Sequence, residues 1–149
     1  MDDILFDQEF FNAARRGLRT LSAAEKKLLK ASIEDKILED GSFAGPHGES
    51  DIYMTSFGFA LQTLLDSDKN AAASTKYLQA KDHGENLGFL HIASLSRCWR
   101  FYSHESLAAG LYEKIAEKLE YSRCNDGAWN QASGTHFSSV YGTYLAIAA

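Results

Sequence analysis

The sequence predicts an all-α fold built from two layers of helices. Segments that carry charged residues alternate along the chain with segments that carry none, which is typical of inner helices covered by amphipathic outer ones. The period-two alternation of strands is absent, and an up-down four-helix bundle would make every helix amphipathic. A single Pro in 149 residues also favours long helices, because Pro breaks them.

The composition is that of one globular domain spanning residues 1–149. The chain is 45% hydrophobic and 23% charged, which is too apolar for a disordered segment. Its 15 basic and 20 acidic residues give a net charge of −5. This balance excludes the dense basic surfaces that bind nucleic acid or anionic membranes. The richest basic cluster, Arg15, Arg16 and Arg19 on the first predicted helix, is interpreted as a solvated face.

The sequence gives no sign of export. Two cysteines, Cys98 and Cys124, do not make a disulfide scaffold in a chain of this size. The start Met1-Asp2-Asp3 lacks the basic and apolar regions of a signal peptide, and no run approaches the ~20 apolar residues of a membrane span. We expect a reduced, cytoplasmic protein that is not integral to a membrane.

Three charged segments are predicted to form the outer helices. The first begins at Ser22, where Glu25 completes a capping box, and its apolar stripe is Leu29, Ile33 and Ile37. We expect it to end at Asp40-Gly41. A weaker helix spans 71–81. The third spans 106–121 and stops near Asp126-Gly127; its stripe consists of Leu107, Leu111, Ile115 and Leu119.

Three uncharged segments, 52–65, 87–96 and 137–149, are predicted to form the inner helices. A helix without charge on any side is buried on all sides or faces a partner or a cavity. Gly58, Gly88 and Gly142 lie inside these segments and each cost about 1 kcal/mol relative to Ala. We expect close packing or close approach of a ligand to offset that cost.

Two stretches, 40–53 and 126–139, form an internal repeat. Each follows an outer helix with the pattern Asp-Gly-x-aromatic and a polar loop, and Asp126 lies 86 residues after Asp40. A third opening at Gly88-Phe89 places the repeat loops near 40–51, 82–88 and 124–137. We expect the Gly to end the outer helix in a left-handed conformation and the aromatic residue to pack the loop against neighbouring helices.

These stretches resemble the repeat of the prenyltransferase and squalene/terpene cyclase superfamily. The run Asp-Gly-Ser-Phe…Gly-Glu-Ser-Asp from Asp40 is similar to protein-prenyltransferase β-subunit repeats. The run Asp-Gly-Ala-Trp-Asn-Gln from Asp126 is similar to bacterial members. The resemblance implies a partial α/α toroid of about three to three and a half helical hairpins. Because one toroid hosts several chemistries, it predicts the fold more specifically than the function.

The metal and acid motifs of the superfamily are absent from the matching positions. The zinc-binding Asp-x-Cys is replaced by Asp51-Ile52-Tyr53, and no Asp-x-Asp-Asp acid cluster occurs. Asp66-Ser67-Asp68 is interpreted as a solvated charge pair at a helix end. The stretch Asp2-Asp3…Asp7 departs from the Asp-Asp-x-x-Asp spacing that binds magnesium. We expect neither zinc nor magnesium, no other cofactor, and assign no catalytic residue.

The resemblance places the inner-helix N-termini around one mouth, where helix dipoles favour an anion. The candidate ligand-binding residues at this mouth are His47, Glu49, Asp51, Tyr53, His136 and Tyr141. Neither loop carries a Lys or Arg. A purely structural interpretation makes Asp51 a helix N-cap and Glu49 a first-turn dipole partner. His91, Cys98 and Trp99 are interpreted as packing residues.

Two functions follow as expectations. The first is binding of an isoprenoid or other hydrophobic ligand in an apolar concave face, with any transferase or cyclase role implied by the resemblance alone. The alternative is a non-catalytic module for protein–protein interaction or oligomerisation. Because full toroids have about twice this length, we expect a homodimer or part of a longer chain. A sugar-active α/α barrel is less favoured, since its carboxylate candidates, Glu49 and Asp51, share one loop.

Overall fold

The computed structural model describes residues 6–67, 70–101 and 110–149 and consists of helices joined by loops. These residues contain no strand, only three isolated antiparallel bridges. The helices are α1 (Phe6–Thr20), α2 (Ala23–Glu34), α3 (Ile52–Leu64), α4 (Ala71–Lys81), α5 (Phe89–Trp99), α6 (Leu111–Glu120) and α7 (Val140–Ile147). The all-α prediction is confirmed. No helix in the described residues is long and apolar enough to cross a membrane.

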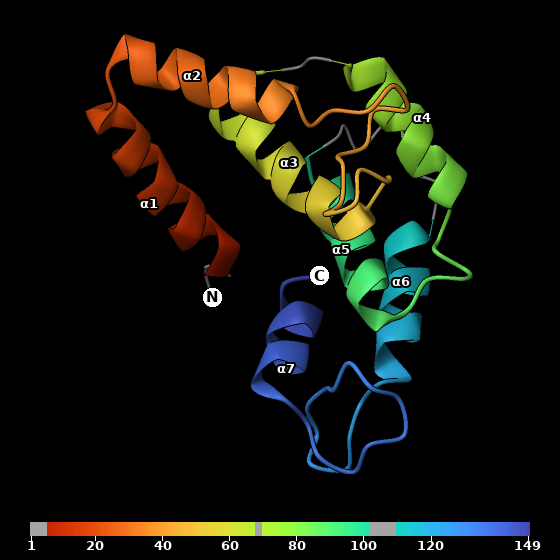
Figure 1. Cartoon of the computed structure of the whole chain (residues 1–149). Coiled ribbons are helices and arrows are strands. Elements are labelled where there is room, and N and C mark those ends of the chain that lie inside the picture. Colours follow the sequence, from red (N-terminus) through yellow and green to blue (C-terminus); the bar gives the residue numbers. More distant parts are fainter. Residues whose placement is uncertain (1–5, 68–69, 102–109) are drawn as a thin grey trace.

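Helix α5 lies in the middle of the molecule and packs against α3, α4, α6 and α7 (Figure 1). Helices α1 and α2 pack on α3 and form an arm at one side. The uncharged helices α3, α5 and α7 are therefore neighbours, with charged helices covering α3 and α5. Closure of these helices into a toroid stays a prediction.

The burial of α5 explains why its sequence lacks charge almost throughout. Every residue from Ile92 to Trp99 is buried, and its small hydroxyl residues are satisfied by carbonyl groups. Ser94 donates to the carbonyl of Leu90 at 2.8 Å, and Ser96 donates to that of Ala149. The helix runs three residues beyond the predicted segment 87–96, and this extension brings the charged Arg97 into the interior.

The first outer helix, α2, begins as predicted but ends earlier. Ser22 and Glu25 form the capping box of α2, and Ile33 is buried. Yet α2 ends at Glu34 rather than at Asp40. The reason is a tight hairpin in which the amide of Leu38 donates to the carbonyl of Ser42 at 2.9 Å. These backbone hydrogen bonds replace the helical ones.

Helix α6 ends at Glu120 with Tyr121 as its C-cap, in agreement with the predicted end at residue 121. Its stripe residues Leu111, Ile115 and Leu119 are buried as predicted. The predicted start at residue 106 and Leu107 lie outside the described residues. Helix α4 spans Ala71–Lys81, the range that the sequence predicts.

The two repeat loops have matching hydrogen bonds. Gly41 and Gly127 both adopt positive φ, at 83° and 85°, and each amide donates to a carbonyl three residues earlier. The carboxylates of Asp40 and Asp126 each accept from the amide two residues on. The antiparallel bridges Ile37–Phe43 and Arg123–Trp129 are also related by 86 positions. The internal repeat of the sequence is thus a repeat of backbone structure.

The repeat continues into the inner helices with a shift of two further residues. Asp51 and Ser139 cap α3 and α7. The amide of Phe43 donates to Oγ1 of Thr55 at 3.0 Å, and that of Trp129 to Oγ1 of Thr143 at 3.3 Å. In both loops, therefore, the aromatic residue is tied to the second turn of the inner helix.

Close packing explains two of the three inner-helix glycines. A Cβ at Gly58 would lie 2.3 Å from the ring of Phe43, and one at Gly142 would lie 2.8 Å from the carbonyl oxygen of Trp129. The aromatic residue thus holds the loop on the inner helix, as expected. Gly88 differs, because it is the N-cap of α5 and has open space around it.

Candidate functional site

The first turns of α3 and α7 meet through two tyrosines at equivalent repeat positions. The hydroxyl oxygens of Tyr53 and Tyr141 lie 2.9 Å apart and share a hydrogen bond. Both helices pack on α5 and otherwise have few contacts with each other. The structure therefore brings together two of the six predicted site residues, at the N-terminal ends of two inner helices.

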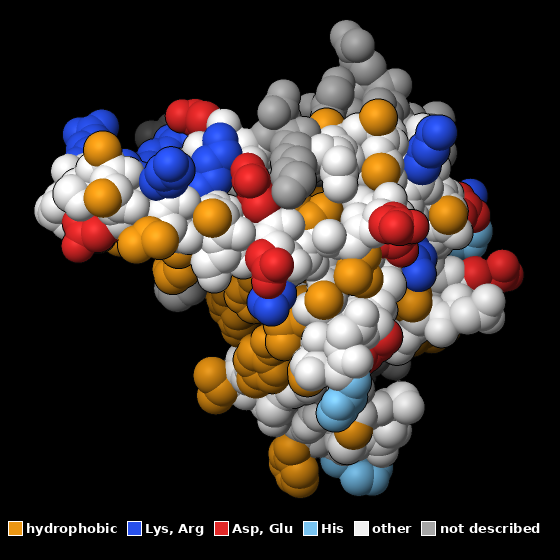
Figure 2. Space-filling view, turned by 45° about the horizontal axis from the view of Figure 1, so that its top comes forward, with side chains coloured by type: hydrophobic (Ala, Val, Ile, Leu, Met, Phe, Trp, Pro, Cys, Tyr) orange, Lys and Arg blue, Asp and Glu red, His pale blue; other side chains and the backbone are white. Residues whose placement is uncertain are grey.

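One side of α3 leaves apolar side chains exposed next to this tyrosine pair. Phe57 and Leu61 follow Tyr53 at intervals of four residues and are 41% and 38% exposed. The rings of Tyr53 and Phe57 meet edge to face, with centroids 5.0 Å apart. Figure 2 shows hydrophobic side chains gathered below the α1–α2 arm, toward the end that carries α7. We call Tyr53, Phe57, Leu61 and Tyr141 the aromatic face.

A buried cation stands behind the aromatic face. Arg97 comes from α5, is only 7% exposed, and its guanidinium carbon lies 5.3 Å from the centroid of the Phe57 ring. At this distance the cation is attracted to the π-system. Arg97 was not among the site residues predicted from the sequence. Its signal is that it is the first charged residue after an uncharged run that forms an inner helix.

Tyr141 is held in its neutral form. Burial, followed by the hydrogen bond with Tyr53, raises the pKa of Tyr141 to about 12, and the charge of Arg97 opposes this rise. Neutral tyrosine hydroxyls both donate and accept hydrogen bonds. Tyr141 therefore offers a polar contact without adding a negative charge beside Arg97, and its raised pKa extends this state to alkaline pH.

The other four candidates stay apart from the tyrosine pair. Asp51 is the N-cap of α3 and accepts from the amide of Met54 at 3.0 Å, as the structural interpretation expected. Glu49 precedes the N-cap Asp51 and so does not lie in the first turn of α3; its carboxylate lies close to Gly45 in the same loop. His47 and His136 are exposed on the two loops. No described hydrogen bond joins these residues to Tyr53 or Tyr141.

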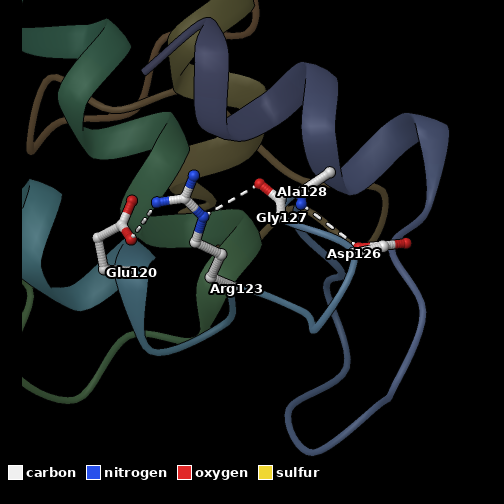
Figure 3. A network of polar contacts seen from close by, with 5 residues as sticks. All are labelled: Glu120, Arg123, Asp126, Gly127 and Ala128. Atoms are coloured by element: carbon white, nitrogen blue, oxygen red, sulfur yellow. Dashed lines mark hydrogen bonds and ion pairs between the residues drawn. The ribbon is translucent and has the colours of Figure 1, made fainter.

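The second loop is held by its own polar contacts (Figure 3). Arg123 donates from Nε to the carbonyl of Gly127 at 3.0 Å and from Nη1 to Glu120 at 3.2 Å. Its guanidinium also lies 5.0 Å from the centroid of the Trp129 ring. The carboxylate of Asp126 accepts from the amides of Ala128 and Ser138. These charged groups stabilise the loop and do not point to a ligand.

Residues interpreted as packing lie in or near the core. Cys98 and Trp99 are 0% and 2% exposed, and burial raises the pKa of the Cys98 thiol. His91 is half-buried. The described residues contain no group of three His, Cys, Asp or Glu side chains placed to hold a metal ion. Asp2, Asp3 and Asp68 lie outside the described residues.

Comparison with protein-family models, with curated proteins and with solved structures found no match to this chain.

Proposed function

We propose that this chain is a helical-repeat module of the prenyltransferase–terpene cyclase type that binds an isoprenoid-like ligand on the aromatic face. The observation that carries the proposal is the exposed apolar row on α3, which ends at a tyrosine pair and stands over Arg97. The apolar body of the ligand would lie on Phe57 and Leu61. An anionic head would lie near the tyrosine hydroxyls and the guanidinium, which suits phosphate groups.

Two further observations support this type of ligand. Contiguous exposed apolar surface marks ligand or partner sites in globular proteins. The loops that begin at Asp40 and Asp126 have matching backbone hydrogen bonds, and the same stretches resemble the superfamily in sequence. Binding is the proposed activity, and no residue is assigned a catalytic role.

The test is a thermal-shift series with farnesyl diphosphate, farnesol and inorganic diphosphate. A ligand that binds only the folded chain raises its unfolding temperature, and the rise grows with the ratio of the ligand concentration to its dissociation constant. We expect the largest rise with farnesyl diphosphate, a smaller rise with farnesol and none with inorganic diphosphate. The absence of any rise with both isoprenoids, or an equal rise with inorganic diphosphate, would contradict the proposal.

A second candidate function, self-association, is favoured by the exposed side of α7. Val140 is 92% exposed and Ile147 is 65% exposed, and the segment 137–149 carries no charged residue. A second copy could cover this side without bringing like charges together, although the chain as a whole is acidic. The proposed partner is thus another molecule of the same chain.

Sedimentation velocity tests this second function. We expect the wild-type chain to form dimers at micromolar concentration. The double variant Val140→Glu/Ile147→Glu should be monomeric, because symmetric pairing would bury like charges. Tyr121→Glu is the matched control, since Tyr121 is 87% exposed but lies outside α7. A monomeric wild type, or a double variant that dimerises like the control, would exclude α7 as the interface.

A further inference from the structure

A pocket lies between the arm and the end of α3, on residues that the proposed function does not use. Its volume is about 430 Å³, within the range typical of small-molecule sites. Its apolar wall comes from half-buried leucines of α1 and of the C-terminal end of α3. The residues that line it are Leu18, Lys26, Lys27, Lys30, Leu64, Leu65 and Asp66.

Three lysines stand together at this pocket at an electrostatic cost. Lys26 and Lys30 are four residues apart on α2, and Lys27 and Lys30 are three apart. Like charges at these spacings repel each other on a helix surface. An anion placed between the lysines would relieve this repulsion.

The neighbouring carboxylates are engaged elsewhere. Glu25 accepts from the amide and hydroxyl of Ser22, each at 2.7 Å. Glu34 accepts from the hydroxyl of Ser67 at 3.2 Å. Among the described residues no carboxylate lies within ion-pair distance of the three lysines. Asp66 is the acidic residue among the described residues of the lining, and together these residues carry a net positive charge.

We propose that this pocket binds an anionic amphiphile, a single phosphate or carboxylate group carried on an apolar chain. The ammonium groups would bind the anionic head as point charges, and the leucine wall would cover the chain. The arm on which the pocket lies carries the densest group of Lys and Arg side chains in Figure 2. A free phosphate would leave the leucine wall uncovered, and a neutral lipid would leave the lysines without a counter-charge.

The test is residue-resolved NMR titration of the whole chain with n-decyl phosphate below its micelle concentration. We expect saturable shifts at Leu18, Lys26, Lys30 and Leu64, and at least tenfold weaker binding of decanol and of inorganic phosphate. Lys26→Gln/Lys27→Gln/Lys30→Gln should weaken the binding of decyl phosphate at least tenfold. Because NMR follows each residue separately, binding of decyl phosphate at the aromatic face would be distinguished from binding in the pocket.

The matched control is Arg15→Gln/Arg16→Gln/Arg19→Gln, which removes three exposed charges from the same arm without touching the pocket. We expect this variant to bind decyl phosphate within about twofold of wild type. If both triple variants lost the same affinity for decyl phosphate, the ligand would be attracted to the arm as a whole, and the proposed binding in the pocket would be overturned. The proposal would also be overturned if the chain sedimented with phosphatidylglycerol vesicles but showed no saturable response to monomeric decyl phosphate.

Discussion

At the scale of single residues, function and stability depend on a few close contacts between elements far apart in sequence. Phe43 lies against Gly58, Tyr53 bonds to Tyr141, and Arg97 stands behind Phe57. Each contact joins a residue whose type is unusual for its helix to a partner that explains it. A glycine inside a helix and a cation in an uncharged segment are the two plainest cases.

Gly58→Ala should destabilise the chain by about 1–3 kcal/mol, because the added Cβ would lie 2.3 Å from the buried Phe43 ring. Gly17→Ala is the control: Gly17 lies inside α1 with nothing within 4 Å. Its replacement should stabilise the chain by up to about 1 kcal/mol through helix propensity. Urea unfolding measures both. Equal effects of the two substitutions would show that the contact with Phe43 is unimportant.

The tyrosine pair predicts a loss of stability at alkaline pH. Because burial and the Tyr53 hydrogen bond raise the pKa of Tyr141 from 10 to about 12, its contribution is fully present below pH 10. The contribution of Tyr141 to the free energy of unfolding is lost as the pH rises from 10 to 12, because in this range the tyrosine ionises in the unfolded chain before it ionises in the folded chain. Tyr53→Phe should lower the pKa of Tyr141 only part of the way to 10, since burial is the larger cause.

Ultraviolet-absorbance titration of the tyrosines measures this pKa when the wild type is compared with Tyr141→Phe. The difference curve reports Tyr141. A midpoint near 10 in the folded wild type would contradict the hydrogen-bonded pair and the raised pKa of Tyr141.

At the scale of elements, the sequence predicts best those helix boundaries that local residues determine. Ser22 and Glu25 mark the start of α2 because the capping box is local. The end of α2 at Glu34 depends on the hairpin at Leu38 and Ser42, which competes with continued helix. Arg97 was missed for a related reason: its contact with Phe57 spans 40 positions, and helical periodicity within α5 does not reveal it.

The threonines that tie the loops to the inner helices predict a graded effect. Thr55→Val should cost about 1–3 kcal/mol, because it leaves the buried amide of Phe43 without its acceptor. Thr143→Val should cost less, since Thr143 is half-buried and water can replace it. Thr63→Val, at an exposed site on α3, is the control. Calorimetric melting of the three variants measures these effects. If Thr63→Val were the most destabilising, the two threonines would not tie the repeat loops to the inner helices.

At the scale of the whole molecule, the chain is a set of inner helices centred on α5, with an apolar face on α3 and α7 and a basic arm at one side. The sequence predicted the helical class, the alternation of layers and the repeat of 86 positions. It placed six residues at one mouth, of which the structure joins two, Tyr53 and Tyr141. The remaining four lie in loops or at a cap, where side-chain positions do not follow from helix periodicity. The homodimer and the cytoplasmic location stay predictions.

The central claim is that the aromatic face binds an isoprenoid-like ligand. It is tested most directly by isothermal titration calorimetry of farnesyl diphosphate with wild type, Phe57→Ser and Phe10→Ser. Phe10 is 65% exposed on α1 and outside the face. All three should be measured in the Lys26→Gln/Lys27→Gln/Lys30→Gln background, which removes the pocket of the arm. We predict saturable binding that Phe57→Ser weakens about tenfold, or about 1.4 kcal/mol, and that Phe10→Ser leaves unchanged. Absence of binding, or equal affinity in the three chains, would contradict the claim.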